Sequence, residues 1–98
     1  MTIKKEVNGS KLNIALVGRL DTNTSPKLEK ELKSSLENTK ELVFDLTQLE
    51  YISSAGLRVL LAAQKTMNKQ GSMTVCNVNE KVMEVFEMTG FVDILTIV

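Results

Sequence analysis

The chain has 98 residues, and its twelve basic side chains balance its twelve acidic ones. A neutral chain lacks the positive surface that attracts a nucleic-acid backbone, so we expect no binding of DNA or RNA. No apolar run approaches the roughly 20 residues that span a bilayer, and the first residues lack the apolar core of a secretory signal. We expect a single cytoplasmic domain, residues 1–98, with one modest core and no insertion into a membrane.

Missing residue types exclude several kinds of catalytic site. The sequence contains no histidine, which rules out Ser-His-Asp and Cys-His arrangements and any histidine-ligated metal. It contains neither of the glycine-rich patterns that cradle phosphates. The single cysteine, Cys76, can form no internal disulfide, and we expect it to be a small buried residue. We therefore expect no catalytic residues, no metal and no cofactor, and a protein that acts by binding.

The N-terminal part of the chain predicts a β-hairpin. Two extended segments, residues 3–7 and 11–17, flank the sequence Asn8-Gly9-Ser10, and Asn-Gly between extended segments is a strong hairpin signal. In the second segment apolar residues alternate with others, as in a half-buried strand.

A loop that begins at Asp21 leads into the first predicted helix. Ser25 is the expected N-cap and Pro26 suits the first helical position. Leucines at every fourth position predict a narrow apolar stripe on this helix, which we expect to end near Asn38.

The centre of the chain predicts a strand, a loop and a second helix. The apolar run at residues 42–44 fits a strand covered on both faces. Asp45 is expected to end this strand, and residues 47–50 are expected to form a loop. The second helix is predicted from about Ser54 to Lys69, with Gly71 as its C-terminal cap.

The last third of the chain predicts a strand at residues 73–78, a helix at 80–88 begun by Asn79, and a final strand within residues 92–98. Strands separated by helices of this length imply crossover connections and a largely parallel sheet. The expected fold class is therefore α/β, with a mixed central sheet, an N-terminal hairpin and about three to four helices.

The stretch from Tyr51 to Leu57 holds the most informative motif. Its paired serines, Ser53 and Ser54, stand at the predicted start of the second helix. Serine is a preferred N-cap, and the same helix end favours an anion through the helix dipole. A serine here is either a passive cap or a hydroxyl whose phosphorylated form the helix end already accommodates.

The chain resembles the STAS family, and within it the small bacterial anti-sigma factor antagonists. The resemblance lies in residues 45–57, Asp-Leu-Thr-x-Leu-x-Tyr-Ile-Ser-Ser-Ala-Gly-Leu, and in three weaker pieces that follow the family's order and spacing. These pieces are residues 18–24, Gly-Arg-Leu-Asp-x-x-Thr, residues 42–46, and residues 88–91.

The resemblance implies a function by binding. In this family the unphosphorylated antagonist binds an anti-sigma factor that is also a serine kinase, and the sigma factor is released. The kinase then phosphorylates one serine of the antagonist, and a phosphatase resets it. By position the phosphorylated serine corresponds to Ser54. The family often has an aspartate just before this serine, and this chain instead has Ser53, a second hydroxyl, which is therefore the fallback site. The free protein is expected to be a monomer.

The resemblance also implies a partner-binding surface around this serine. The residues expected to form it are Asp21, Thr24, Ser53, Ser54, Ala55 and Gly56. Alternatives remain for individual residues: Asp21 can stabilise its loop, Thr24 can cap the first helix, and Gly56 can serve the start of the second helix.

Two other functions remain open at this point. The chain can be a STAS scaffold subunit that is never phosphorylated, within a lipid-transport complex or a stressosome-like assembly. A serine hydrolase that uses Ser54 would need a lysine base, since there is no histidine and no Gly-x-Ser-x-Gly motif. An ester-hydrolysis assay tests that alternative.

Overall fold

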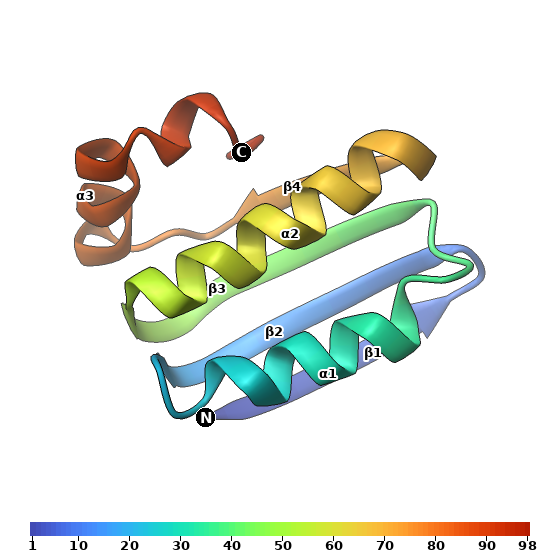
Figure 1. Ribbon diagram of the computed structural model, residues 1–98, viewed down its shortest axis with the longest axis horizontal. Coiled ribbons are helices and arrows are strands. Elements are labelled where there is room, and N and C mark those ends of the chain that lie inside the picture. The colour runs from blue at the N-terminus through green and yellow to red at the C-terminus, as the bar shows by residue number, and fades with distance from the viewer.

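The computed structural model describes residues 1–98 as a four-stranded sheet with three α-helices and one short 3₁₀-helix. In chain order these elements are β1 (Thr2–Asn8), β2 (Lys11–Leu20), α1 (Ser25–Ser35), β3 (Glu41–Ile52), α2 (Ser54–Gln70), β4 (Ser72–Cys76), α3 (Glu80–Thr89) and η1 (Phe91–Asp93) (Figure 1). The sheet order is β1-β2-β3-β4, with β1 antiparallel to β2 and the other neighbours parallel. The predicted mixed α/β sheet with an N-terminal hairpin is therefore confirmed.

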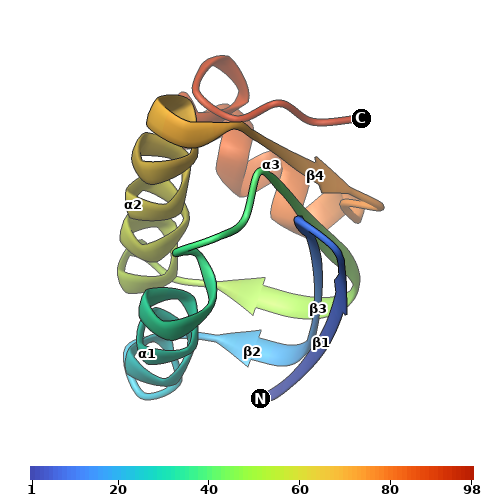
Figure 2. The same cartoon turned by 90° about the vertical axis from the view of Figure 1, so that its right-hand side faces the viewer.

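Helices α1 and α2 lie side by side against one face of the sheet (Figure 2). Alternate strand residues point toward them, and the fully buried side chains of the sheet include Leu12, Ile14 and Leu16 of β2. The expected stripe of α1 is also buried, through Leu28, Leu32 and Leu36. The core therefore lies between this helix pair and the sheet. No helix of the chain is both long and apolar enough to cross a membrane.

Strand β3 differs from the prediction in length and in covering. It continues through Asp45 and the expected loop at residues 47–50 as far as Ile52. Only one of its faces is buried by helices, while Val43 and Asp45 on the other face are half-buried. A single aspartate does not end the strand because its side chain points to the open face, where it meets hydrogen-bond donors.

Strand β2 also continues beyond its predicted end, to Leu20. Its pairing with β3 shifts register between Ala15 and Val17 and again between Gly18 and Arg19. Gly18 has φ +100°, a conformation that only glycine adopts readily. The two long parallel strands therefore end together, with Leu20 opposite Ile52.

The predicted final strand is wrong. Residues 91–93 form the 3₁₀-helix, and the tail makes only one bridge to the sheet, between Val75 and Ile97. Strand β4 has only five residues, so it offers little edge for a further strand. Leu95 is buried, whereas Ile94 remains exposed.

Helix ends agree with the sequence at α3 and differ at α1. Asn79 caps α3 as predicted, and its side chain accepts the amide N–H of Val82 at 2.9 Å. At α1 the cap residue is Thr24 rather than Ser25, and the helix ends at Ser35. Ser25 is the first helical residue, with its amide donating to the backbone oxygen of Asp21 at 2.8 Å. Its hydroxyl donates to the same oxygen at 2.6 Å and so does not cap the helix.

Candidate functional site

The serine turn, residues 53–56, joins β3 to α2. Its two serines have different roles. Ser53, not Ser54, is the N-cap of α2: it has extended backbone dihedrals, and its Oγ accepts the amide N–H of Gly56 at 3.4 Å. Its carbonyl accepts the N–H of Leu57 at 2.9 Å, which starts the helical ladder. The capping role that sequence reasoning gave to either serine therefore belongs to Ser53.

Ser54 is the first residue of α2, and it is exposed. Its hydroxyl makes no hydrogen bond within the protein. Because Ser53 already supplies the cap, the Ser54 hydroxyl has no structural task at this helix end. It lies instead at the positive end of the helix dipole, a favourable place for an added negative charge.

Gly56 is buried where α2 comes closest to the ends of β2 and β3. A Cβ at this position would lie 2.8 Å from Cγ of Leu20 and 2.9 Å from Cγ1 of Ile52. Direct contact with a partner, as expected from the sequence, does not fit this interior position. Gly56 acts by packing, because it lets the first turn of α2 approach the sheet and so places the two residues before it.

The loop between β2 and α1, residues 21–24, is held by reciprocal hydrogen bonds, and we call it the Asp21 loop. Oδ1 of Asp21 accepts the amide of Thr24 at 3.1 Å, and Oγ1 of Thr24 accepts the amide of Asp21 at 2.8 Å. The amide of Asn23 also donates to Oδ1 of Asp21, at 3.0 Å. Burial raises the pKa of Asp21, but these hydrogen bonds and the nearby charge of Arg19 outweigh it, so that the pKa lies below its usual value. Both side chains thus rigidify the loop.

Arg19 and Tyr51 form an exposed pair at the edge of this loop. The guanidinium of Arg19 lies 4.2 Å from the ring centroid of Tyr51, and its Nε lies 3.8 Å from Oδ2 of Asp21. The two residues are partners in the β2–β3 register. Sequence reasoning did not single out this pair, because it ended β3 at Asp45 and so could not place Tyr51 opposite Arg19.

The Asp21 loop and the serine turn lie next to each other. The amide of Ser53 donates to the carbonyl of Leu20 at 2.9 Å, directly before Asp21 in the chain. Residues of both segments line one hollow of about 260 Å³, including Thr22, Ala55 and Arg58. Arg58, an exposed residue one turn after Ser54, is a second cation that sequence reasoning did not single out. The sequence-predicted residues are thus brought together, with Ser54 exposed, Ala55 half-buried and Gly56 beneath them.

Asp45 belongs to a different place, the open face of the sheet. Its Oδ1 accepts the hydroxyl of Thr47 at 2.5 Å and the side-chain amide of Asn77 at 3.2 Å. These bonds, with the backbone amide of Thr47, hold the pKa of Asp45 below its usual value. Cys76 is half-buried here, not fully buried as expected, and burial raises the pKa of its thiol. Asp45 thus acts as a structural hydrogen-bond acceptor on this face.

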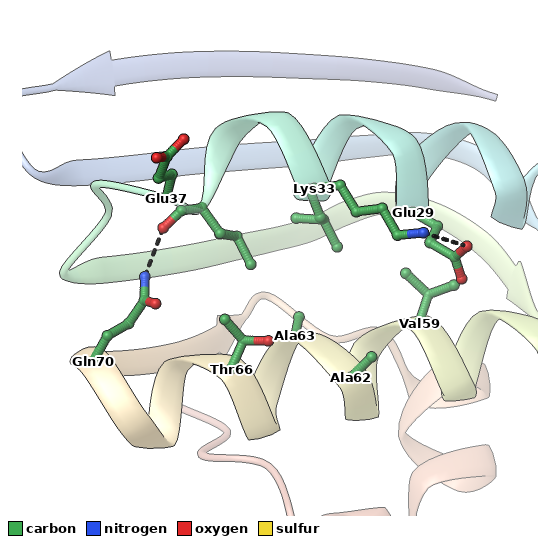
Figure 3. Close-up of a pocket in the computed structure, with 10 residues that line it drawn as sticks. Glu29, Lys33, Glu37, Val59, Ala62, Ala63, Thr66 and Gln70 are labelled. Carbon is green, nitrogen blue, oxygen red and sulfur yellow. Dashed lines mark hydrogen bonds and ion pairs between the residues drawn. The ribbon is translucent and has the colours of Figure 1, made fainter.

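The largest cavity lies between α1 and α2 and has a volume of about 430 Å³ (Figure 3). Its apolar wall includes Leu32 and Val59. Most polar side chains around it already pair within the protein. Nζ of Lys33 lies 3.7 Å from Oε1 of Glu29, and Nε2 of Gln70 donates to the carbonyl of Leu36 at 2.6 Å. Ser54 does not line this cavity. The cavity thus lies apart from the serine turn.

A family model for the STAS domain matches residues 2–98. The chain belongs to the STAS family. This agrees with the fold, in which a mixed sheet carries the serine turn at the start of α2.

Two curated relatives and one solved structure are similar to this STAS chain. BtrV of Bordetella bronchiseptica is 38% identical over 84 residues, which cover 84% of this chain and 72% of BtrV. The anti-sigma-B factor antagonist of Bacillus subtilis is 32% identical over 96 residues, which cover 97% of this chain and 86% of that protein. The fold also matches Bacillus SpoIIAA in its phosphorylated form, with a TM-score of 0.77 and 16% identity over 99% of this chain and 91% of that one.

Proposed function

We propose that this STAS chain is an anti-sigma factor antagonist controlled by phosphorylation of Ser54. In the unphosphorylated form it binds an anti-sigma factor that has serine kinase activity, and the sigma factor is released. Phosphorylation of Ser54 ends this binding, and a phosphatase restores it. The chain acts by binding and is a substrate of the kinase, not an enzyme. The name of the Bacillus subtilis relative supports the antagonist function.

One observation carries the choice of Ser54. Its hydroxyl is exposed and makes no hydrogen bond, while the neighbouring Ser53 is committed to capping α2. A kinase needs a serine whose oxygen can reach the γ-phosphate of ATP. Phosphorylation of Ser53 would remove the cap, whereas phosphorylation of Ser54 leaves it in place.

The physics of a phosphate at Ser54 supports a switch in binding rather than in folding. A phosphoserine adds about −1.5 to −2 charges near neutral pH. At the first turn of a helix, the dipole favours such a charge by about 0.3–1 kcal/mol. On a docking surface the same charge must lose water or meet acidic groups, and each 1.4 kcal/mol of penalty weakens binding about tenfold. The similar fold of SpoIIAA in its phosphorylated form agrees with a phosphate that leaves the domain folded.

The proposed docking surface joins the serine turn to the Asp21 loop. Ser54 and Ala55 would contact the anti-sigma factor directly. Asp21 and Thr24 would contribute by holding the neighbouring loop rigid, which reduces the entropy cost of docking. Gly56 would set the position of the turn from below.

The decisive experiment is the intact mass of the protein from its own host, followed by peptide mapping across residues 41–65. We expect one phosphate, on Ser54. The Ser54→Ala variant should lose it, and the matched control Ser53→Ala should keep it. A phosphate on Ser53 would keep the switch and overturn the site. No phosphate under growth and stress, together with stably co-purifying subunits, would favour the scaffold alternative and overturn the switch.

Binding should follow the phosphate. By calorimetry with the purified anti-sigma factor, we expect Ser54→Asp to bind at least about tenfold more weakly than the wild type. Ser54→Ala should bind with nearly unchanged affinity. Equal affinity of Ser54→Asp and the wild type would show that charge at Ser54 does not control docking.

A further inference from the structure

Strand β1 leaves one edge of the sheet without a partner. It is the outermost strand, at the opposite side of the sheet from β4 (Figure 1). The hairpin loop consists of Gly9 and Ser10, so Asn8 and Lys11 close it as a hydrogen-bonded pair. Even-numbered residues of β1 therefore bond to β2. The backbone N–H and C=O groups of Ile3, Lys5 and Val7 point outward and find no partner in the chain.

The charge pattern of this strand is complementary to itself. If a second copy pairs antiparallel about Lys5, Ile3 lies opposite Val7 and Lys4 lies opposite Glu6, each contact occurring twice. The Lys4–Glu6 contacts fall at non-hydrogen-bonded positions, where facing side chains come closest. Within one chain neither Lys4 nor Glu6 makes an ion pair, although four other pairs are present.

The two neighbouring registers are unfavourable. The outward groups belong to odd-numbered residues, so the nearest shifts of an antiparallel pairing move its centre by one residue, to Lys4 or to Glu6. The first shift places Lys4 directly opposite Lys4, and the second places Glu6 opposite Glu6. Like charges directly opposite each other are destabilising, so the register centred on Lys5 is favoured over both neighbouring registers.

The centre of this register is already neutralised. An inward-pointing lysine normally blocks pairing at a sheet edge. Here Nζ of Lys5 lies 2.7 Å from Oε1 of Glu31 and 3.2 Å from Oγ of Ser35, both on α1. Two copies would therefore bring together two ion pairs rather than two bare ammonium groups. Val7, which is 66% exposed in the single chain, would be partly covered by Ile3 of the second copy.

We propose that a second copy of this chain docks on β1, antiparallel and centred on Lys5, so that one sheet runs through both copies. A single strand edge buries less than the 1,200 Å² or so of a stable interface. The dimer is therefore weak, with a dissociation constant on the order of 100 μM. At low concentration the chain remains the monomer expected from its sequence. This proposal is independent of the phosphorylation of Ser54.

The test is sedimentation of the full chain between about 10 μM and 1 mM, with charge-reversal variants. Lys4→Glu and Glu6→Lys each create like-charge contacts and should weaken self-association about tenfold or more. Mixing these two variants restores opposite charges at every contact, so a heterodimer should form. The double variant K4E/E6K should associate like the wild type.

These variants alter exposed side chains, and circular dichroism verifies their fold. Amide spectra on dilution should shift at residues 3–7. A monomer at 1 mM would overturn the proposal. So would self-association that neither single reversal weakens, or a failure of the mixed variants to associate, because each result would place the contact elsewhere.

Discussion

Ser53 and Gly56 are joined by the capping bond at the start of α2, in which the amide of Gly56 donates to Oγ of Ser53 at 3.4 Å. The adjacent Ser54 hydroxyl takes no part in it. The two serines of the turn are therefore separable in an experiment, one through the stability of the fold and the other through binding.

Ser53→Ala should destabilise the fold, and Ser54→Ala should not. Loss of an N-cap costs about 1 kcal/mol, which lowers the melting temperature of a domain of this size by about 4–8 °C. Ser54→Ala alters an exposed group without a partner, so the change should stay within about 0.5 kcal/mol. Thermal and urea unfolding measure both. Equal losses for the two variants would show that the cap is not confined to Ser53.

Gly71→Ala adds only a methyl group, yet it should be among the substitutions that destabilise this fold most. The C-cap of α2 lies so close to the start of β3 that an added Cβ would overlap the carbonyl of Lys40, 1.8 Å from its oxygen. The backbone on both sides must move, and we expect a loss of about 3 kcal/mol or more. Urea unfolding measures this loss.

Gly90→Ala is the matched control for Gly71. Gly90 has φ +80° and open space around its Cβ position, so alanine there pays only the backbone strain of about 1–2 kcal/mol. If both variants lost the same stability, the contact with Lys40 would be easily relieved.

Local patterns predicted most of the elements, because hairpin and cap signals act within a few residues. The Asn8-Gly9 turn and the Asn79 cap are examples, and both are present. The length of β3 could not be predicted in this way. Its second half is stabilised by pairing with β2 across two register shifts, and no local pattern reports such pairing.

The tail shows the opposite failure. Its apolar residues have high strand propensity, yet a strand also needs an edge of matching length. Strand β4 ends at Cys76, and only Val75 bonds to the tail.

At the candidate site, the sequence predicted that the Asp21 loop lies near the two serines, and the structure brings these segments together. The sequence could not show which of Ser53 and Ser54 caps α2, because capping depends on the backbone dihedral angles.

The open face of the sheet should make stability depend on pH through Asp45. Thr47 and Asn77 donate to its ionised carboxylate, so its pKa in the folded protein lies below the ordinary 3.8. For a lowered pKa, the added stability is present above pH 3.8 and is lost as the pH falls through the folded value. Asp45→Asn should therefore be less stable than the wild type near neutral pH, and this difference should shrink at lower pH.

Urea unfolding at about pH 6 and about pH 3 measures this effect. Asp93→Asn is the control, because the Asp93 side chain makes no hydrogen bond or ion pair within the protein, and its difference from wild type should stay small at both pH values. A gap between wild type and Asp45→Asn that grew on acidification would contradict the assigned hydrogen bonding.

Asn79 should contribute to stability through two separable bonds. Its side-chain oxygen accepts the amide of Val82 at 2.9 Å, and its Nδ2 donates to the carbonyl of Leu49 at 2.6 Å. The second bond ties α3 to the half of β3 that β4 does not reach. Asn79→Ala removes both bonds and should cost about 2 kcal/mol or more.

Asn79→Ser distinguishes the two bonds. Serine caps a helix nearly as well as asparagine but carries no amide to reach Leu49, so its loss should be about half that of alanine. Urea unfolding measures both variants, with the exposed Asn38→Ala as the control for loss of an asparagine. Equal losses for serine and alanine would assign the whole effect to the bond with Leu49. If Asn79→Ser lost no stability, the whole effect would belong to the cap, and the bond to Leu49 would add nothing to the stability of the fold.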